Sequence, residues 1–270
     1  VVAVSSGLAA VSIPLVSLLS KDQHIIVTDS LYSPTRKFIK NQLLKYNIKV
    51  DYYSPLSSIN DLKKLIKKNT KLIFIESPGT ATFEIQNIPE IAKLAKKYNV
   101  ATLMDNTWAS FYYCNPFKLG VDIVIEAATK YINGHSDILL GFISSDISTA
   151  KIVRSYSKTL GLCSGSEEIY LALRGLPTLE LRIKEIEKNA LNLAIKLTKE
   201  KKIKKVFHPA LKSHENYKIW KRDFSGSSGL FSFELKKKYS NTLLEKFCKK
   251  LKLFKIGYSW GGFESLITFP

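Results

Sequence analysis

Short apolar runs alternate with amphipathic segments through the first two thirds of the chain. Residues 59–68 carry apolar side chains at helical spacing, whereas residues 72–75 form a continuous apolar run of strand length. The same alternation predicts further strands at residues 25–27, 50–53, 100–104 and 121–125, and further helices at residues 7–19, 35–46 and 89–98. Strands that alternate with helices form a mostly parallel sheet covered on both faces, so the pattern predicts an α/β fold.

The pattern changes after the segment Arg174-Gly-Leu-Pro177. A long helix is predicted at residues 178–202, and a strand at residues 230–235 follows a turn rich in serine and glycine. We expect a large domain at residues 1–174, without its N-terminal part, and a smaller, incomplete α+β domain at residues 175–270. The chain opens without Met and inside an apolar run, which favours a fragment of a longer protein.

Composition narrows the class of protein. Of the 270 residues 45% are hydrophobic, yet no uninterrupted apolar run is long enough to cross a bilayer. The first residues lack the basic segment of a signal peptide, so we expect a cytoplasmic protein without a membrane segment. Cys114, Cys163 and Cys248 form no CxxC pair, and the four histidines show no metal-binding spacing. Reduced thiols and no metal site are therefore expected.

The net charge of +18 raises the alternative of a nucleic-acid-binding protein. Only five of the 41 basic residues are arginine, the residue that reads phosphates and bases best. The lysines are scattered along the polar faces of predicted helices, as in residues 61–68 and 93–97. A lysine-rich composition explains the charge better than a binding stripe does, and we expect no nucleic-acid partner.

Two polar residues directly follow predicted buried strands. Asp105 comes after the run that ends at Met104, and Lys130 comes shortly after the run that ends at Ile125. Ligands of open α/β sheets bind at this edge. A lysine amine can form a Schiff base there, and a carboxylate can keep a pyridinium nitrogen protonated. The pair predicts a pyridoxal phosphate (PLP) site, although Asp105 alone suits a helix N-cap and Lys130 alone suits the surface.

Three further residues would complete such a site. Gly7 opens a helix, whose N-terminal N–H groups can bind the phosphate. Thr129 can add a hydroxyl, and Tyr32, after another strand, can stack on an aromatic ring. Two of them also have a plain interpretation, because Gly7 fits a tight turn and Tyr32 fits an ordinary loop.

A glycine-rich segment near the end of the chain is the last dense motif. It runs from Tyr258 through Ser259 and Trp260 to two glycines. Two glycines let the backbone turn close to a ligand. A hairpin with a buried tryptophan is an equally good interpretation.

Taken together, these motifs resemble the Cys/Met-metabolism family of PLP-dependent enzymes, and within it the bacterial cystathionine β-lyase branch. The resemblance covers essentially all 270 residues. Its carriers are Ser6-Gly-Leu8, Tyr32, Glu76-Ser-Pro-Gly79, Asp105-Asn-Thr-Trp108, Ala128-Thr-Lys-Tyr131, Gly134-His-Ser-Asp137, Trp220-Lys-Arg-Asp-Phe-Ser-Gly226 and Tyr258-Ser-Trp-Gly-Gly262. It implies the fold of the aspartate aminotransferase-like (fold type I) enzymes, truncated in its smaller domain.

The resemblance also implies a role for each candidate residue. Lys130 holds PLP covalently and then moves protons, assisted as a catalytic residue by Tyr32, which stacks on the ring. The remaining roles are the pairing of Asp105 with the pyridinium nitrogen, phosphate binding by Gly7, Leu8 and Thr129, and substrate binding by Tyr258, Ser259 and Trp260. Two positions depart from the family pattern: Ala127 stands where relatives often carry a phosphate-binding serine, and Thr80 stands where many carry asparagine.

The implied reaction is β-elimination of L-cystathionine to homocysteine, pyruvate and ammonia, a transsulfuration step of methionine biosynthesis. The implied assembly is a homotetramer, a dimer of dimers. The family's Tyr-x-Arg motif and its substrate-binding arginine would lie outside residues 1–270. Open alternatives are a cystathionine γ-synthase or γ-lyase, a cofactor-free Schiff-base aldolase that uses Lys130, and, more distantly, a basic nucleic-acid-binding protein.

Overall fold

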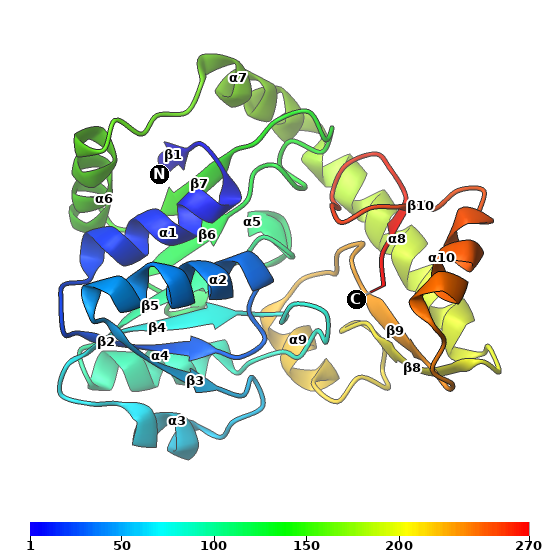
Figure 1. The fold of residues 1–270 in the computed structure, drawn as a ribbon, viewed down its shortest axis with the longest axis horizontal. Helices are drawn as coiled ribbons and strands as arrows, with labels where there is room; N and C mark the ends of the chain where they lie inside the picture. The colour runs from blue at the N-terminus through cyan, green and yellow to red at the C-terminus, as the bar shows by residue number, and fades with distance from the viewer. Residues whose placement is uncertain (270) are drawn as a thin grey trace.

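A seven-stranded sheet forms the centre of the computed structural model, which describes residues 1–269 (Figure 1). The strand order is β1-β7-β6-β5-β4-β2-β3. The strands are β1 (Val2–Val4), β2 (His24–Thr28), β3 (Lys49–Tyr53), β4 (Thr70–Glu76), β5 (Ala101–Asp105), β6 (Ile123–Glu126) and β7 (Gly141–Ser144). All neighbours from β3 to β6 pair in parallel, and β7 alone runs antiparallel, between β6 and β1. The predicted mostly parallel α/β fold is confirmed.

Helices cover both faces of this sheet, as Figure 1 shows. The helices of this part are α1 (Gly7–Leu18), α2 (Ser33–Asn41), α3 (Ile59–Leu65), α4 (Ile88–Lys97), α5 (Ser110–Tyr113), α6 (Ile147–Thr159) and α7 (Ser166–Gly175). Within β4, Leu72 and Phe74 enter the core formed with α1 and α2, whereas Ile73 and Ile75 enter the core formed with α3 and α4. Successive side chains of a strand point to opposite faces, so a strand buried on both faces is continuously apolar.

Two local predictions differ from the structure. The helix expected at residues 35–46 ends at Asn41, and a separate 3-10 turn follows at Leu43–Tyr46. Strand β7 was not predicted. It has four residues, of which only Gly141 and Ile143 are buried. An alternation this short cannot be distinguished from the sequence of a loop.

The rest of the chain forms a long helix and small sheets. Its elements are α8 (Leu179–Thr198), β8 (Ile203–Phe207), α9 (Tyr217–Asp223), β9 (Ser232–Leu235), α10 (Asn241–Lys249), β10 (Lys255–Ile256) and β11 (Leu266–Ile267). Strand β8 pairs antiparallel with β9, and β10 pairs in parallel with β11. The helix predicted at residues 178–202 corresponds to α8, which ends at Thr198, and strand β8 was not predicted. The division into domains at residue 174 stays a prediction.

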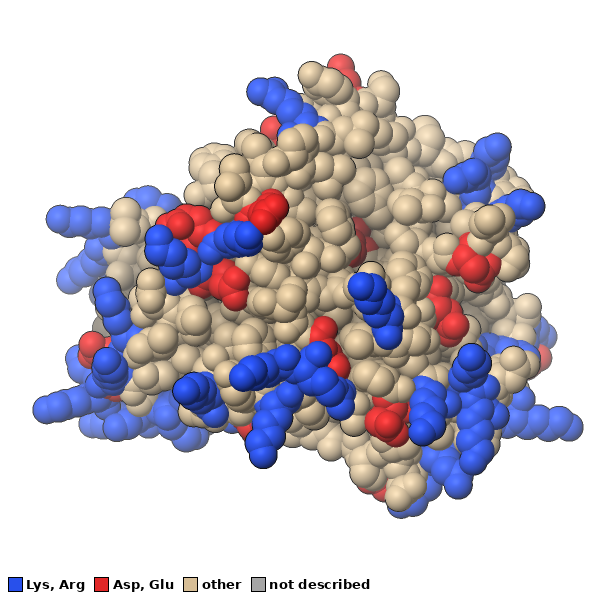
Figure 2. All heavy atoms as spheres, turned by 180° about the vertical axis from the view of Figure 1, so that it is seen from behind, with Lys and Arg blue, Asp and Glu red and all other residues tan. Residues whose placement is uncertain are grey.

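Charged side chains are spread widely over the face that Figure 2 shows, with acidic groups between several of the lysines and arginines. This distribution agrees with scattered lysines on helix faces. In the part of the chain that the structure describes, no helix has both the length and the apolar character needed to span a bilayer.

Candidate active site

The N-terminus of α1 lies directly against the segment that precedes Lys130. Ser6 caps the helix, and its Oγ accepts a hydrogen bond of 3.1 Å from the N–H of Ala9. A Cβ atom on Gly7 would lie 2.5 Å from the Cβ of Ala127, so only glycine allows this approach. The N–H groups of Gly7 and Leu8 belong to the first turn and therefore have no acceptor within the helix.

Lys130 lies in the turn after β6 and contacts the glycine-rich segment from the far end of the chain. Its Nζ donates a hydrogen bond of 3.0 Å to Ser259 Oγ and lies 4.9 Å from the centre of the Trp260 ring. Gly261, at φ +86°, packs so closely that an added Cβ would lie 2.9 Å from the Lys130 main chain. Burial lowers the pKa of the amine. Tyr258, in contrast, is 83% exposed.

Asp105 ends β5 and is connected to the Lys130 segment through one threonine. Its Oδ1 accepts hydrogen bonds from the Thr107 N–H (2.9 Å) and from the Thr107 hydroxyl (2.6 Å). The same Thr107 oxygen accepts a bond of 2.9 Å from the N–H of Ala127. Burial raises the pKa of the Asp105 carboxyl, because a charge is poorly solvated there.

Two glutamates flank Asp105. Sequence reasoning gave neither of them a role. Glu76 ends β4 and is in register with Asp105, and Glu126 ends β6 on the other side. Burial raises the pKa of each to about 8, with a further contribution from the negative charge of Asp105. The signal was present in the sequence, because each glutamate follows an apolar run just as Asp105 does.

Tyr32 lies at the start of α2 and is bound through its main chain. Its N–H donates a hydrogen bond of 2.8 Å to Glu76 Oε2, while its side chain is half exposed. The hydroxyl of Thr80 donates to the other oxygen of the same carboxyl group. The loops that follow β2 and β4 therefore meet at Glu76.

Thr129 makes its hydrogen bonds within its own turn. Its Oγ1 accepts a bond of 3.0 Å from the Leu140 N–H and donates one of 3.2 Å to the Leu140 carbonyl. A hydroxyl has one proton to donate. A bond from this side chain to a phosphate therefore requires the O–H to turn away from Leu140.

The turn after Lys130 is held by a residue that sequence reasoning also missed. Arg182, on α8, donates hydrogen bonds of 2.8 Å to the carbonyls of Tyr131 and Gly175, and a third of 3.2 Å to that of Ile132. Gly134, at φ +74°, leaves room for the guanidinium group. A single arginine within a helix of alternating charges gives no sequence signal for such convergence.

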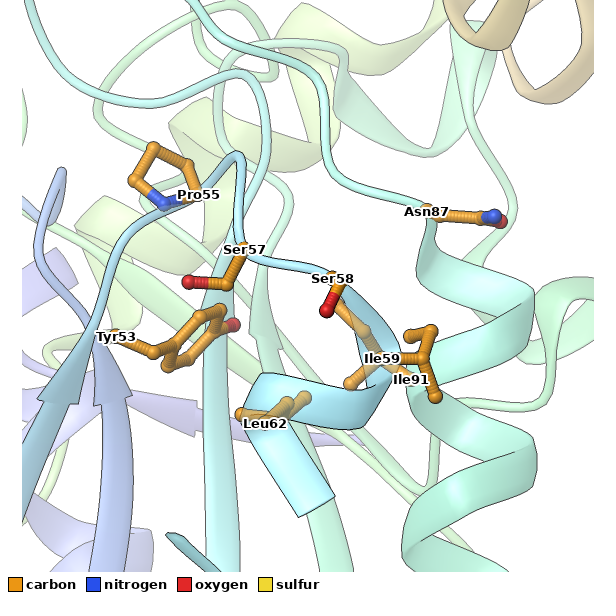
Figure 3. A pocket seen from close by; sticks show the side chains of 8 residues that line it. All are labelled: Tyr53, Pro55, Ser57, Ser58, Ile59, Leu62, Asn87 and Ile91. Carbon is orange, nitrogen blue, oxygen red and sulfur yellow. The ribbon is translucent and has the colours of Figure 1, made fainter. Parts of the chain in front are cut away.

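A separate cavity of about 140 Å³ opens beside β3 and α3 (Figure 3). It is lined by Tyr53, Pro55, Ser57, Ser58, Ile59, Leu62, Asn87 and Ile91, and includes none of the residues described above. Within residues 1–269 no group of three or more histidine, cysteine or acidic side chains is arranged to hold a metal ion.

Comparisons with known proteins show what the whole chain is similar to. The chain is 43% identical over 258 residues to a Saccharomyces cerevisiae protein provisionally named cystathionine beta-lyase, covering 96% of this chain and 76% of that one. It is 40% identical to the L-alanine/L-glutamate racemase of Wolbachia pipientis, covering 97% and 64%. The crystal structure of metB from Corynebacterium glutamicum superposes with a TM-score of 0.93 at 31% identity, covering 98% and 68%.

The match therefore spans about two thirds to three quarters of the length of these proteins. The family description "Cys/Met metabolism PLP-dependent enzyme" matches residues 1–270, without interruption between the sheet and the C-terminal elements. The strand-end site of Lys130 and Asp105 and the similarity over the whole sequence lead to the same conclusion: the chain belongs to the Cys/Met metabolism family of PLP-dependent enzymes.

Proposed function

We propose that this chain forms the cofactor site and part of the substrate site of a PLP-dependent carbon–sulfur lyase that cleaves L-cystathionine by β-elimination. The observation that carries the proposal is the contact of the Lys130 amine with Ser259 and Trp260, which joins a candidate base to a candidate substrate-binding segment. Several relatives, among them proteins of Haemophilus influenzae and Escherichia coli, bear the name cystathionine beta-lyase.

The residues present fit PLP in three respects. The first-turn N–H groups of Gly7 and Leu8 suit its phosphate. The partly buried carboxyl group of Asp105 accepts its bonds from Thr107 and has no basic partner among residues 1–269, so it suits a cationic ring nitrogen. The Lys130 amine suits the aldehyde, because its lowered pKa increases its neutral, nucleophilic fraction.

PLP, when bound, supplies an electron-accepting ring. The chain's own groups then bind, orient and move protons. Asp105 would keep the ring nitrogen protonated, the Tyr32 ring would stack on the cofactor ring, and Thr129 would bind the phosphate once its hydroxyl turns from Leu140.

The proton steps belong to Lys130. Its Nζ, oriented by Ser259 Oγ, takes the proton from the substrate Cα, and a proton reaches sulfur as the Cβ–S bond breaks. Homocysteine leaves, and the remaining three-carbon fragment reacts with water to give pyruvate and ammonia. Tyr258, Ser259 and Trp260 line the substrate end in this proposal.

We also propose a cytoplasmic homotetramer, with domains at residues 1–174 and 175–270. The assembly is supported by large apolar side chains that stand exposed over a short stretch of α6 and α7. They are Ile147 and Ile152 of α6, Leu160 at the C-cap of α6, and Tyr170 and Leu173 of α7.

The test of the reaction uses the full-length protein, PLP and L-cystathionine. Pyruvate and homocysteine in equal amounts are expected, measured by a coupled dehydrogenase assay and by thiol titration. Formation of 2-oxobutyrate and cysteine instead would overturn β-elimination. Racemisation of alanine or glutamate without pyruvate would favour the second candidate, a racemase, which the Wolbachia relative suggests.

The test of the cofactor site is an absorbance spectrum. We expect the unmodified protein to show a visible band with PLP and Lys130→Ala to lose it, because the band requires a covalent link to the amine. Lys151→Ala, an exposed lysine on α6, is the matched control and should keep the band. A band that survives Lys130→Ala would exclude Lys130 as the attachment point.

A further inference from the structure

We propose that Glu76 is a positioning residue: it holds the main chain of Tyr32 and thereby sets the tyrosine ring over the cofactor. The inference rests on the proposed function only through the role of Tyr32 beside PLP. Glu76 itself lies one strand away from Asp105, at the buried end of β4.

The first step concerns the start of α2. Tyr32 occupies the N-cap position of this helix, and its own side chain makes no capping bond. The bond of 2.8 Å from the Tyr32 N–H to Glu76 Oε2 therefore provides, from another strand, a carboxyl oxygen as acceptor at a helix N-terminus. The N–H groups at this end of a helix have no acceptor within the helix, so a side-chain oxygen from elsewhere in the fold satisfies one of them.

The second step concerns the exposure of the Tyr32 ring. The residue is 49% exposed, so packing holds the ring on one side only. The Tyr32 carbonyl accepts a bond of 3.1 Å from the Arg36 N–H, which closes the first helical turn. Because the side chain is half exposed, the direction of its Cα–Cβ bond depends on these main-chain bonds, of which the one to Glu76 has a buried carboxyl group as its acceptor.

The third step concerns what holds Glu76. Its other carboxyl oxygen accepts from the Thr80 hydroxyl, and the Thr80 N–H donates a bond of 2.7 Å to the Ser30 carbonyl. Gly79 lies so close to Ser30 that an added Cβ would be 2.4 Å from its Oγ. The segment before Tyr32 and the loop after β4 are thus held together by the bond from Thr80 to Ser30 and by the two bonds to Glu76.

The bonds of Glu76 need two hydrogen-bonding atoms in fixed places and do not need a charge. A glutamine at this position would accept from the Tyr32 N–H through its oxygen and donate to Thr80 Oγ1 through its amide. An alanine would remove both bonds. These two variants therefore separate the positioning of Tyr32 from an effect of charge on the neighbouring Asp105.

The test compares Glu76→Gln and Glu76→Ala in the full-length protein. The readouts are the dissociation constant of PLP, from quenching of tryptophan fluorescence, and the visible circular dichroism of the bound cofactor, which reports the asymmetry of its surroundings. We expect Glu76→Gln to retain both signals, and Glu76→Ala to weaken PLP binding by about tenfold, as expected for loss of hydrogen bonds to a buried group, and to reduce the dichroism.

A double-variant comparison shows whether Glu76 acts through Tyr32. In a Tyr32→Ala background, Glu76→Ala should have no further effect on PLP binding, because the ring to be positioned is gone. Additive losses would overturn the proposal, and so would equal losses in Glu76→Gln and Glu76→Ala. If Glu76→Ala does not fold, Thr80→Val removes one of the two bonds and should weaken binding and dichroism partially; unchanged values would overturn the proposal.

These measurements do not depend on the reaction catalysed. Failure to cleave L-cystathionine with intact PLP binding would overturn the proposed function and leave the role of Glu76 standing. Absence of PLP binding by the unmodified protein would overturn both.

Discussion

At the scale of single residues, three carboxyl groups end three adjacent strands and differ in what surrounds them. Asp105 is bonded by Thr107, Glu76 by Tyr32 and Thr80, and Glu126 by Asn106. Glu76 and Glu126 are buried and Asp105 is partly buried, so each is costly to ionise unless a cation approaches. Of the three, only Asp105 has a proposed cationic partner, the ring nitrogen of PLP.

Glu126 should therefore make the protein less stable as pH rises. Its folded-state pKa of about 8 lies above its ordinary value of 4.5, so the protonated form favours the folded state below pH 4.5 and this contribution is lost as pH rises through 8. Glu126→Gln keeps an acceptor for the 3.0 Å bond from Asn106 and cannot ionise. We expect it to be more stable than the unmodified protein by about 1–3 kcal/mol at pH 9, and by less at pH 5.

Thermal unfolding of both proteins from pH 5 to pH 9 measures this difference. Glu200→Gln, at an exposed glutamate, is the control. Its melting temperature should change with pH in parallel with that of the unmodified protein. Parallel curves for Glu126→Gln would show that Glu126 is ionised without cost in the folded state.

Sequence reasoning at this scale selected Lys130 and Asp105 as candidates because a mechanism needs that pair after two buried strands. It did not assign Glu76 or Glu126, although both follow apolar runs, because no partner for either is visible along the chain. The partners of Glu76 are a main-chain N–H and a hydroxyl from other loops, and such contacts have no side-chain pattern.

At the scale of elements, the start of α1 depends on the absence of a side chain. We expect Gly7→Ala to lower the free energy of unfolding by about 1–3 kcal/mol, as overpacking does, because the new methyl group would lie 2.5 Å from Ala127 Cβ. Urea unfolding followed by circular dichroism measures the loss. Ala127→Gly in the same chain removes the opposing methyl group and should restore much of the stability; without such rescue, the close approach would not be the cause.

Most elements of the sheet were predictable, because strands buried on both faces and amphipathic helices have distinct periods. The end of α2 was not, because residues 43–46 continue the apolar spacing after the helix has stopped. Strand β7 was not predicted because it has only four residues, of which Ile143 alone buries a side chain.

At the scale of the whole molecule, Arg182 connects the C-terminal helix α8 to the turn after Lys130. Arg182→Lys loses the planar guanidinium group that donates to three carbonyls. We therefore expect the free energy of unfolding to fall by about 2–3 kcal/mol. Hydrogen exchange of the amides in residues 130–134 should also speed up. Arg174→Lys, at an exposed arginine of α7, is the matched control. Exchange that stays at the unmodified rate would show that the turn is rigid without Arg182.

The class of fold was predictable at this scale from the alternation of strands and helices, whereas the approach of residues 258–262 to Lys130 was not. The family resemblance implied a common site, and the contact itself depends on a positive φ at Gly261 and on the course of the loops between the small sheets. Those loops have no period from which a path could be derived.

The antiparallel pairing of β1 with β7 has a consequence for folding during synthesis. Val2 lies opposite Ile143, so the first strand has to wait until about 140 further residues have left the ribosome before its partner exists. Gly141 of β7 also packs against the start of α1, where the phosphate is proposed to bind: an added Cβ would lie 2.3 Å from the Ser6 carbonyl oxygen. This contact forms only after β7 has been made. This part of the cofactor site therefore forms late, after β7 has been synthesised. Until β1 pairs with β7, its apolar residues are exposed to aggregation.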